Sequence, residues 1–287
     1  MNIGVVCLSL SCMDFVDVLD FVGSIGGEAI ELCTVKGAHN GTLNLDGPDR
    51  SSLVRAVEDR GLHIASVAGY NDFASSEPGD LPKELERLEY YCRLAADLGV
   101  GIVRAMGGNM QLSLSAEQMI SNITRGFRVA VGIAKQYGVT LALENHGVVV
   151  NDGPTLMRIV EEVGSDNLGL TLDTGNFCWA GHSLDEAHRY FEQLAPYVVS
   201  VHLKDLVTAE GSKTQFVALG DGRVDLRYVV DLLADRGYQG ALLCEYEGMG
   251  DPKELLKSGV FEQERYVRGL KAGTERSLAY LRSLTLN

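Results

Sequence analysis

Four residues that can bind a metal ion or transfer a proton stand at the ends of short apolar segments: Glu144, Asp173, His202 and Glu245. The first two intervals between them are 29 residues long and the third is 43 residues long. A strand followed by a helix takes about 30 residues, so this spacing places the four on consecutive strands. Three carboxylates and an imidazole that converge would form a mostly oxygen-donor site, suited to Mn²⁺ or Mg²⁺, with Co²⁺ or Zn²⁺ as alternatives.

Each of these residues, taken alone, could equally cap a neighbouring loop or helix. Taken together they favour a metal site, because three converging carboxylates without a cation would repel one another.

The elements that must position these residues alternate along the whole chain. Eight candidate strands lie near residues 3–8, 29–33, 62–68, 101–105, 140–144, 169–173, 199–204 and 241–246, with a helical pattern between successive strands. This count predicts an α/β fold, a (β/α)₈ barrel that forms a single domain over residues 1–287. Period-two alternation turns Glu144, Asp173, His202 and Glu245 inward, at the barrel end that carries the chemistry in this architecture.

Helix boundaries are marked by local signals. Ser115 with Gln118, and Ser183 with Glu186, fit the capping box that opens a helix. Glycines such as Gly138 and Gly164 stand where a helix should end before the next strand.

Composition excludes several classes of protein. The net charge is −14 and no cluster of Lys and Arg is present, which excludes a nucleic-acid-binding surface. No apolar run is long enough to span a membrane. The six cysteines contain no Cys-x-x-Cys pair and lie in apolar segments, so we expect reduced thiols and a cytoplasmic protein that acts on a small molecule.

Five segments together resemble a known family: Glu144-Asn-His146, Asp173-Thr-Gly-Asn176, Val201-His-Leu-Lys-Asp205, Leu219-Gly-Asp-Gly-Arg223 and Glu245-Tyr-Glu-Gly248. They look like the xylose isomerase-like TIM barrels, the sugar isomerases and epimerases grouped with tagatose 3-epimerase and inosose dehydratase. The resemblance covers essentially the whole chain.

The resemblance implies that Glu144, Asp173, His202 and Glu245 bind one divalent ion, with Mn²⁺ as the expected metal. It also implies that Glu144 and Glu245 act as acid and base on a keto sugar, by proton abstraction next to the carbonyl through an enediolate. A homodimer or homotetramer is the oligomer expected from the family. A sugar-binding barrel without catalytic activity is the less favoured interpretation.

Two positions depart from the 3-epimerase pattern. Asn176 replaces the His that those enzymes place three residues after the metal-binding Asp, and Thr208 replaces an Arg six residues after the His ligand. These departures bring the chain closer to inosose dehydratase. A metal-dependent lyase or dehydratase, including one that acts on 3-keto glycosides, is therefore the alternative function.

His146 and Lys204 are the residues that would separate the two reactions. His146 could protonate a leaving hydroxyl or hold the substrate, or it could be a loop histidine bonded to backbone. Lys204 could neutralise an enolate oxygen, or it could form an ion pair with Asp205 or Glu245.

Further candidates for substrate binding lie at the ends of the strands or on the loops that follow them. They are Glu31, His39, Asn71, Arg104 and Asn176. Arg104 could grip a substrate oxygen, or it could form a structural ion pair. Four aromatic residues could wall a sugar pocket or pack within their loops: Tyr70, Phe73, Phe177 and Trp179.

Overall fold

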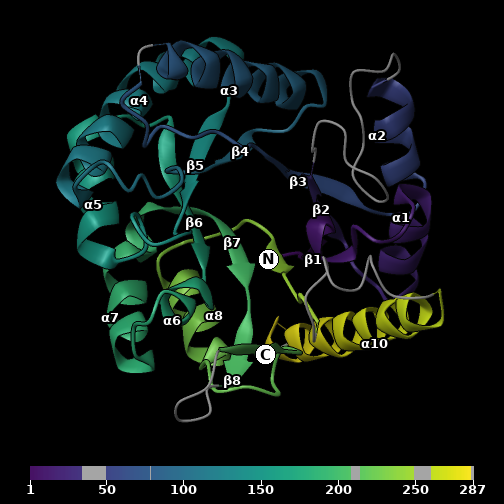
Figure 1. Ribbon diagram of the computed structural model, residues 1–287. Coiled ribbons are helices and arrows are strands. Elements are labelled where there is room, and N and C mark those ends of the chain that lie inside the picture. The colour runs from purple at the N-terminus through teal and green to yellow at the C-terminus, as the bar shows by residue number, and fades with distance from the viewer. Residues whose placement is uncertain (34–49, 78, 208–213, 249–259, 286–287) are drawn as a thin grey trace. The chain divides into compact units, whose positions relative to one another are not determined.

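The computed structural model describes residues 1–33, 50–77, 79–207, 214–248 and 260–285. Eight of its strands close into a barrel in the order β1-β10-β7-β6-β5-β4-β3-β2, and the pairs of known register are parallel (Figure 1). Their bounds are Ile3–Val6 (β1), Ala29–Cys33 (β2), His63–Ala68 (β3), Ile102–Ala105 (β4), Thr140–Glu144 (β5), Leu168–Asp173 (β6), Val198–Leu203 (β7) and Leu242–Cys244 (β10). The predicted (β/α)₈ fold is confirmed.

Helices separate these strands along the chain. The α-helices are Phe15–Ser24 (α1), Arg50–Glu58 (α2), Asp80–Asp97 (α3), Ala116–Tyr137 (α4), Gly153–Val163 (α5), Asn176–Trp179 (α6), Leu184–Leu194 (α7), Leu226–Asp235 (α8) and Val260–Thr285 (α10). Two short 3₁₀ helices span Cys7–Leu10 (η1) and Ala195–Tyr197 (η2). A separate antiparallel hairpin joins Asp205–Val207 (β8) to Gln215–Val217 (β9).

The chain packs as two compact units. The first unit comprises Met1–Ile64, His202–Asp231 and Ala241–Asn287, and the second comprises Ala65–Val201 and Leu232–Gly240. The first unit thus contains two of the predicted metal ligands, His202 and Glu245, and the second contains the other two, Glu144 and Asp173. The assignment of residues 1–287 to one domain stays a prediction.

In the second unit, successive helices α3, α4, α5 and α7 contact one another (Figure 1). The two predicted capping boxes are present, because Ser115 accepts from the Gln118 amide and Ser183 from the Glu186 amide. Helices α4 and α5 end at Gly138 and Gly164, whose φ angles of 67° and 61° are unfavourable for residues with a Cβ.

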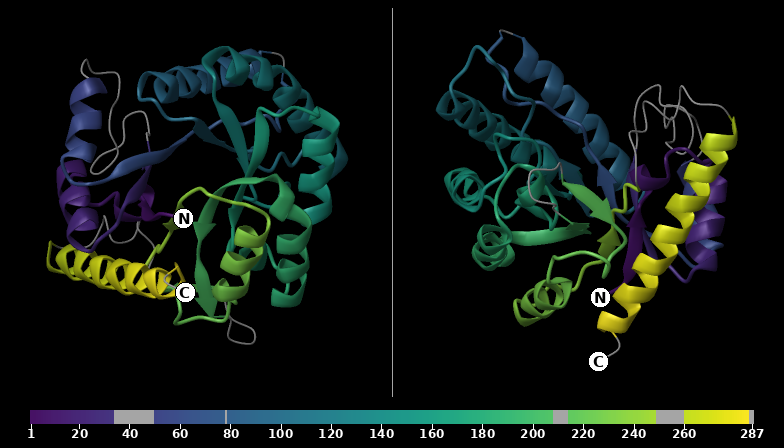
Figure 2. Two further views of the ribbon diagram at one scale, coloured as in Figure 1. Left: turned by 180° about the vertical axis from the view of Figure 1, so that it is seen from behind. Right: turned by 60° about the horizontal axis from the view of Figure 1, so that its bottom comes forward.

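In the first unit, the C-terminal helix α10 packs on β1, β10 and η1, and Figure 2 shows it beside the N-terminal segment. Leu278 and Leu281 of this helix are fully buried. The strand ends differ slightly from the prediction here: β7 ends at Leu203 and β10 at Cys244, so Lys204 and Glu245 directly follow their strands. Strand β10 ends at Cys244 because its pairing with β1 ends there, where Val5 lies opposite Cys244.

The cysteine and membrane predictions agree with the structure. All six cysteines are free thiols, and five of them are buried. Among the residues that the structure describes, no helix combines the length and the apolar character needed to cross a bilayer.

Two glycines of α4 give a paired test of packing against helix propensity. Gly132 is exposed, and a Cβ added there would meet no atom within 4 Å, so we expect Gly132→Ala to raise the free energy of unfolding by about 0.5–1 kcal/mol. A Cβ at Gly126 would lie 2.5 Å from the Phe73 ring, so we expect Gly126→Ala to lower it by about 1–3 kcal/mol despite the same gain in propensity. Urea unfolding measures both, and an equal change in the two variants would contradict the packing argument.

Candidate functional site

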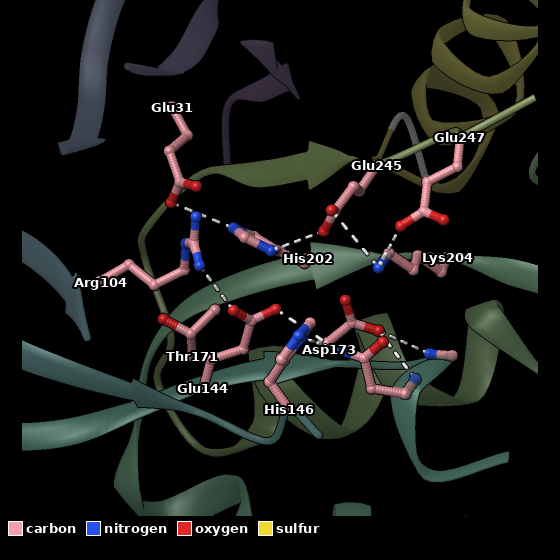
Figure 3. Close-up of polar contacts among 12 residues, drawn as sticks. Glu31, Arg104, Glu144, His146, Thr171, Asp173, His202, Lys204, Glu245 and Glu247 are labelled. Atoms are coloured by element: carbon pink, nitrogen blue, oxygen red, sulfur yellow. Dashed lines mark hydrogen bonds and ion pairs between the residues drawn. The ribbon is translucent and has the colours of Figure 1, made fainter. Parts of the chain in front are cut away.

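In the second unit, Glu144 is the last residue of β5 and is almost completely buried. Its Oε2 atom accepts a hydrogen bond of 2.7 Å from Nη1 of Arg104, which comes from the neighbouring strand β4 (Figure 3). The Arg104 guanidinium also lies 5.4 Å from the centroid of the Tyr70 ring. This buried cation supplies the counter-charge that a buried carboxylate requires. A contact between Arg104 and substrate stays a prediction.

Asp173, the last residue of β6, is fixed at both its backbone and its carboxylate. The Asn145 side chain accepts from the Asp173 amide at 2.7 Å and donates to the Asp173 carbonyl at 2.9 Å. The carboxylate atom Oδ1 accepts from the amides of Gly175 and Asn176, where α6 begins. Asn145, the residue after β5, therefore extends the hydrogen bonding between β5 and β6 and fixes the position of Asp173 at the end of β6.

Asn176 connects Glu144 to His146. Its Nδ2 lies 3.3 Å from Glu144 Oε1 and 3.5 Å from His146 Nδ1. Its backbone carbonyl accepts from Asn151, which also donates to Gly147. His146 itself is exposed, and its ring stacks on Trp179 with an interplanar angle of 17°. The catalytic role of His146 and the substrate-binding role of Asn176 stay predictions.

In the first unit, His202 lies between two carboxylates and is 1% exposed (Figure 3). Its Nε2 is 3.1 Å from Glu31 Oε2, and its Nδ1 is 2.9 Å from Glu245 Oε2. Metal-binding histidines commonly donate one ring N–H to a carboxylate and bind the metal through the other nitrogen. Glu31, predicted to bind substrate, has the position of such an orienting carboxylate, which leaves Nδ1 on the side of Glu245.

Lys204 forms ion pairs with two glutamates. Its Nζ lies 3.4 Å from Glu245 Oε1 and 2.9 Å from Glu247 Oε1, and 5.3 Å from the centroid of the Phe216 ring in β9. The structure thus contains the predicted pair with Glu245. Glu247, two residues after Glu245, is the second glutamate of this group.

The next residue, Asp205, organises the loop that follows the β8–β9 hairpin. Its two carboxylate oxygens accept hydrogen bonds from four backbone amides, those of Leu206, Gly220, Gly222 and Val224, at 2.9–3.1 Å. The Leu219–Gly222 segment forms a turn in which the amides of Gly220 and Gly222 donate to this carboxylate. Sequence reasoning considered Asp205 only as a partner for Lys204 and missed this role.

The remaining predicted residues are placed as follows. Both atoms of the Asn71 side-chain amide bond to the backbone of Met106, at 2.6 and 2.9 Å. A substrate contact by Asn71 therefore stays a prediction. His39 and Thr208 lie outside the described residues.

Two cysteines close in sequence to the site residues have raised pKa values. Their thiolate forms are therefore disfavoured, which makes either residue unfavourable as a metal ligand or nucleophile. Burial raises the pKa of Cys244, which precedes Glu245, to about 12. Burial also raises the pKa of Cys178, two residues after Asn176, to about 11. In each unit, the candidate residues that can bind a metal therefore do so through oxygen or imidazole groups.

Comparison with known proteins identifies the family to which the chain belongs. The model of the xylose isomerase-like TIM barrel family matches residues 19–283. The chain belongs to this family.

Its relatives within the family carry out more than one reaction. The chain is 26% identical over 229 residues to a putative L-ribulose-5-phosphate 3-epimerase of Haemophilus influenzae, covering 75% of this chain and 77% of that protein. It is 23% identical over 226 residues to an inosose dehydratase of Clostridium perfringens, covering 69% and 74%. Other matches are shorter: the chain spans 44% of an uncharacterised protein of Methanocaldococcus jannaschii and 47% of the inosose dehydratase of Serratia proteamaculans, at 29% and 30% identity over 44% of this chain in each case.

Solved structures agree on the fold. A structure of the IOLI protein with a bound zinc atom has a TM-score of 0.76 at 18% identity, covering 98% of this chain and 99% of that one. A probable 3-DHS dehydratase of Bacillus anthracis has a TM-score of 0.74 at 20% identity, with the same coverage. At this level of identity these structures support the barrel fold.

The buried carboxylate of Asp205 allows a direct test of loop organisation. We expect Asp205→Ala to lower the free energy of unfolding by about 3 kcal/mol, because four backbone amides lose their acceptor. The control is Asp221→Ala in the same loop, whose side chain is 56% exposed and forms only a 3.4 Å pair with Arg276. Urea unfolding gives both values. A loss below 1 kcal/mol for Asp205→Ala would contradict the assigned role.

Proposed function

We propose that this chain is a divalent-metal-dependent enzyme that abstracts a proton next to the carbonyl of a keto sugar and then protonates the resulting enediolate to give an isomer or epimer. The observation that carries the proposal is a pair of buried carboxylates, Glu144 and Glu245, each beside a buried cation and each at the carboxyl end of a barrel strand. The family relationship supports a sugar substrate, since an epimerase and inosose dehydratases are among the relatives.

We assign the metal to Glu144, Asp173, His202 and Glu245. Each of these four buried side chains offers an atom that can bind a metal ion, a carboxylate oxygen or an imidazole nitrogen. The chemistry of the donors also fits, because Nε2 of His202 faces the carboxylate of Glu31, a contact that metal-binding histidines commonly make, while Nδ1 lies on the side of Glu245. Three carboxylates and one imidazole suit Mn²⁺, with Mg²⁺, Co²⁺ or Zn²⁺ as alternatives. When bound, the ion would polarise the substrate carbonyl as a Lewis acid.

The side chains around the two glutamates define what each can do. Arg104 holds Glu144 through Oε2, and Asn176 donates to its Oε1, so the orientation of this carboxylate is set from two sides. Lys204 lies beside Oε1 of Glu245, whereas His202 lies beside Oε2. In the proposed reaction one carboxylate removes the proton and the other returns one, which contributes on the order of 10²- to 10⁴-fold for each group.

Elimination of a β-hydroxyl is the second candidate reaction, and Lys204 favours it. Its ammonium group is 3% exposed and adjoins Glu245, which places a proton donor beside one of the two bases. Asn176, which stands where 3-epimerases have a His, also favours elimination over epimerisation. Isomerisation and elimination share the first step and differ in the fate of the enolate.

Three further properties are expected from the sequence. A homodimer or homotetramer and a cytoplasmic location stay predictions. So does Mn²⁺ as the native ion.

Exchange of solvent deuterium tests the proposed chemistry and separates the two reactions. Purified protein loaded with Mn²⁺ is mixed with a panel of keto sugars in D₂O, and the products are followed by mass spectrometry and absorbance. We expect an isomer that carries one deuterium on the carbon next to the carbonyl. An absorbing enone that has lost water would assign the chain to elimination instead.

Two variants show whether the same glutamates perform the reaction. We expect Glu144→Gln and Glu245→Gln each to lower kcat by at least about 10²-fold, because an amide cannot accept the proton. Glu86→Gln on the exposed surface of α3 is the matched control and should leave kcat unchanged. Full activity in either active-site variant would overturn the assignment of acid and base.

A further inference from the structure

The loops that follow β4, β5 and β6 carry no charged side chain. Residues 106–114, 145–151 and 174–184 contain no Asp, Glu, Lys or Arg, although charged residues make up 22% of the chain. Four of the seven large apolar side chains that are exposed in the described part of the chain lie in these loops: Met110, Leu112, Val148 and Trp179. A concentration of exposed apolar groups on neutral loops is typical of a binding surface.

These loops contact one another within the second unit. Gly107 has no room for a Cβ because the Val150 side chain occupies that space. The Asn151 side chain donates to the Asn176 carbonyl at 2.9 Å and so connects the loop after β5 to α6. The exposed apolar side chains are therefore carried by a connected layer of loops.

Trp179 is exposed because α6 is anchored on its opposite face. Phe177 is fully buried, with its ring centroid 5.2 Å from that of Tyr190 and 5.9 Å from that of Phe191. Two residues further along a helix the side chain has turned by about 200°, so Trp179 faces away from this aromatic cluster. Its side chain is 51% exposed, and its ring is stacked on His146 at a centroid distance of 6.3 Å. We call Trp179 and His146 the Trp179 platform.

The Trp179 platform adjoins the candidate base of the second unit. His146 Nδ1 lies 3.5 Å from the Asn176 amide nitrogen, and the same nitrogen lies 3.3 Å from Glu144 Oε1. One side chain thus separates the platform from a carboxylate proposed to act on the substrate. A substituent on a substrate that reaches Glu144 would extend over the stacked rings.

We propose that the Trp179 platform binds an aromatic or other apolar substituent of the substrate, so that the substrate is a neutral keto glycoside and not a sugar phosphate. This inference rests on the proposed function. The exposed indole offers stacking and apolar contact, which favour a flat aglycone. Phosphate recognition uses Arg, Lys or an open helix N-terminus. The three loops contain no Arg or Lys, and at the start of α6 Asp173 already accepts the amides of Gly175 and Asn176.

The sequence contains one tryptophan, so tryptophan fluorescence reports on Trp179 alone. Mn²⁺-loaded protein is titrated with phenyl β-D-glucopyranoside, methyl β-D-glucopyranoside and glucose 6-phosphate. We expect saturable quenching by the phenyl glycoside, with a Kd about tenfold lower than that of the methyl glycoside, which corresponds to about 1.4 kcal/mol. Equal affinity for the two glycosides, or tighter binding of the phosphate, would overturn the proposal.

Variants separate stacking from other roles of this surface. By calorimetry, Trp179→Ala should lose the preference for the phenyl glycoside, whereas Val129→Ala, an exposed apolar control on α4, should keep it. If Trp179→Ala keeps the preference and changes the oligomeric mass in light scattering, the surface is an interface between copies of the chain and the proposal fails. The probes need not be turned over. A retained phenyl preference without deuterium exchange on any keto sugar would therefore overturn the proposed function alone.

Discussion

The structure depends on how carboxylates are kept buried. Glu31, Glu144, Asp173, Asp205 and Glu245 are all nearly inaccessible to solvent, and an isolated buried carboxylate would cost several kcal/mol of stability. Each of these carboxylates has hydrogen-bond donors or cationic groups beside it that offset this cost. Glu144 has a guanidinium, Asp173 and Asp205 have backbone amides, Glu31 has an imidazole, and Glu245 has both an imidazole and an ammonium group.

This compensation also divides the carboxylates by role. The amides around Asp205 use both of its oxygens, which suits a residue that organises a loop. Glu144 instead contacts the guanidinium of Arg104 and the side-chain amide of Asn176. Glu245 contacts the imidazole of His202 and the ammonium group of Lys204. These side chains orient the two carboxylates at the ends of their strands. The proposed metal would add the positive charge that three carboxylates and an imidazole call for.

Sequence reasoning predicted what is set by local pattern. The eight strands, the capping boxes at Ser115 and Ser183, and the acidic strand ends follow from alternation, spacing and short-range hydrogen bonds. Contacts between distant residues could not be predicted. His202 meets Glu31 across 171 residues of sequence and Arg104 meets Glu144 across 40, and no periodic pattern selects such pairs.

Asn145 and Trp179 show a second limit of sequence reasoning, because the role of each depends on contacts that the sequence does not reveal. Asn145 stands in the Glu-Asn-His segment that carries the family resemblance, but only the structure reveals that its amide bonds both backbone atoms of Asp173. The sequence alone leaves both loop packing and a place in a pocket wall open for Trp179. Its exposure follows from the burial of Phe177 on the other face of a one-turn helix, which depends on tertiary contacts with α7.

The most direct measurement of the central claim is calorimetric titration of Mn²⁺ into protein that has been stripped with a chelator and dialysed. The account predicts one ion per chain, at least about tenfold weaker binding in Asp173→Asn, and unchanged binding in Asp221→Asn. Absence of Mn²⁺ binding to the unmodified chain, or equal affinity in Asp173→Asn, would contradict it.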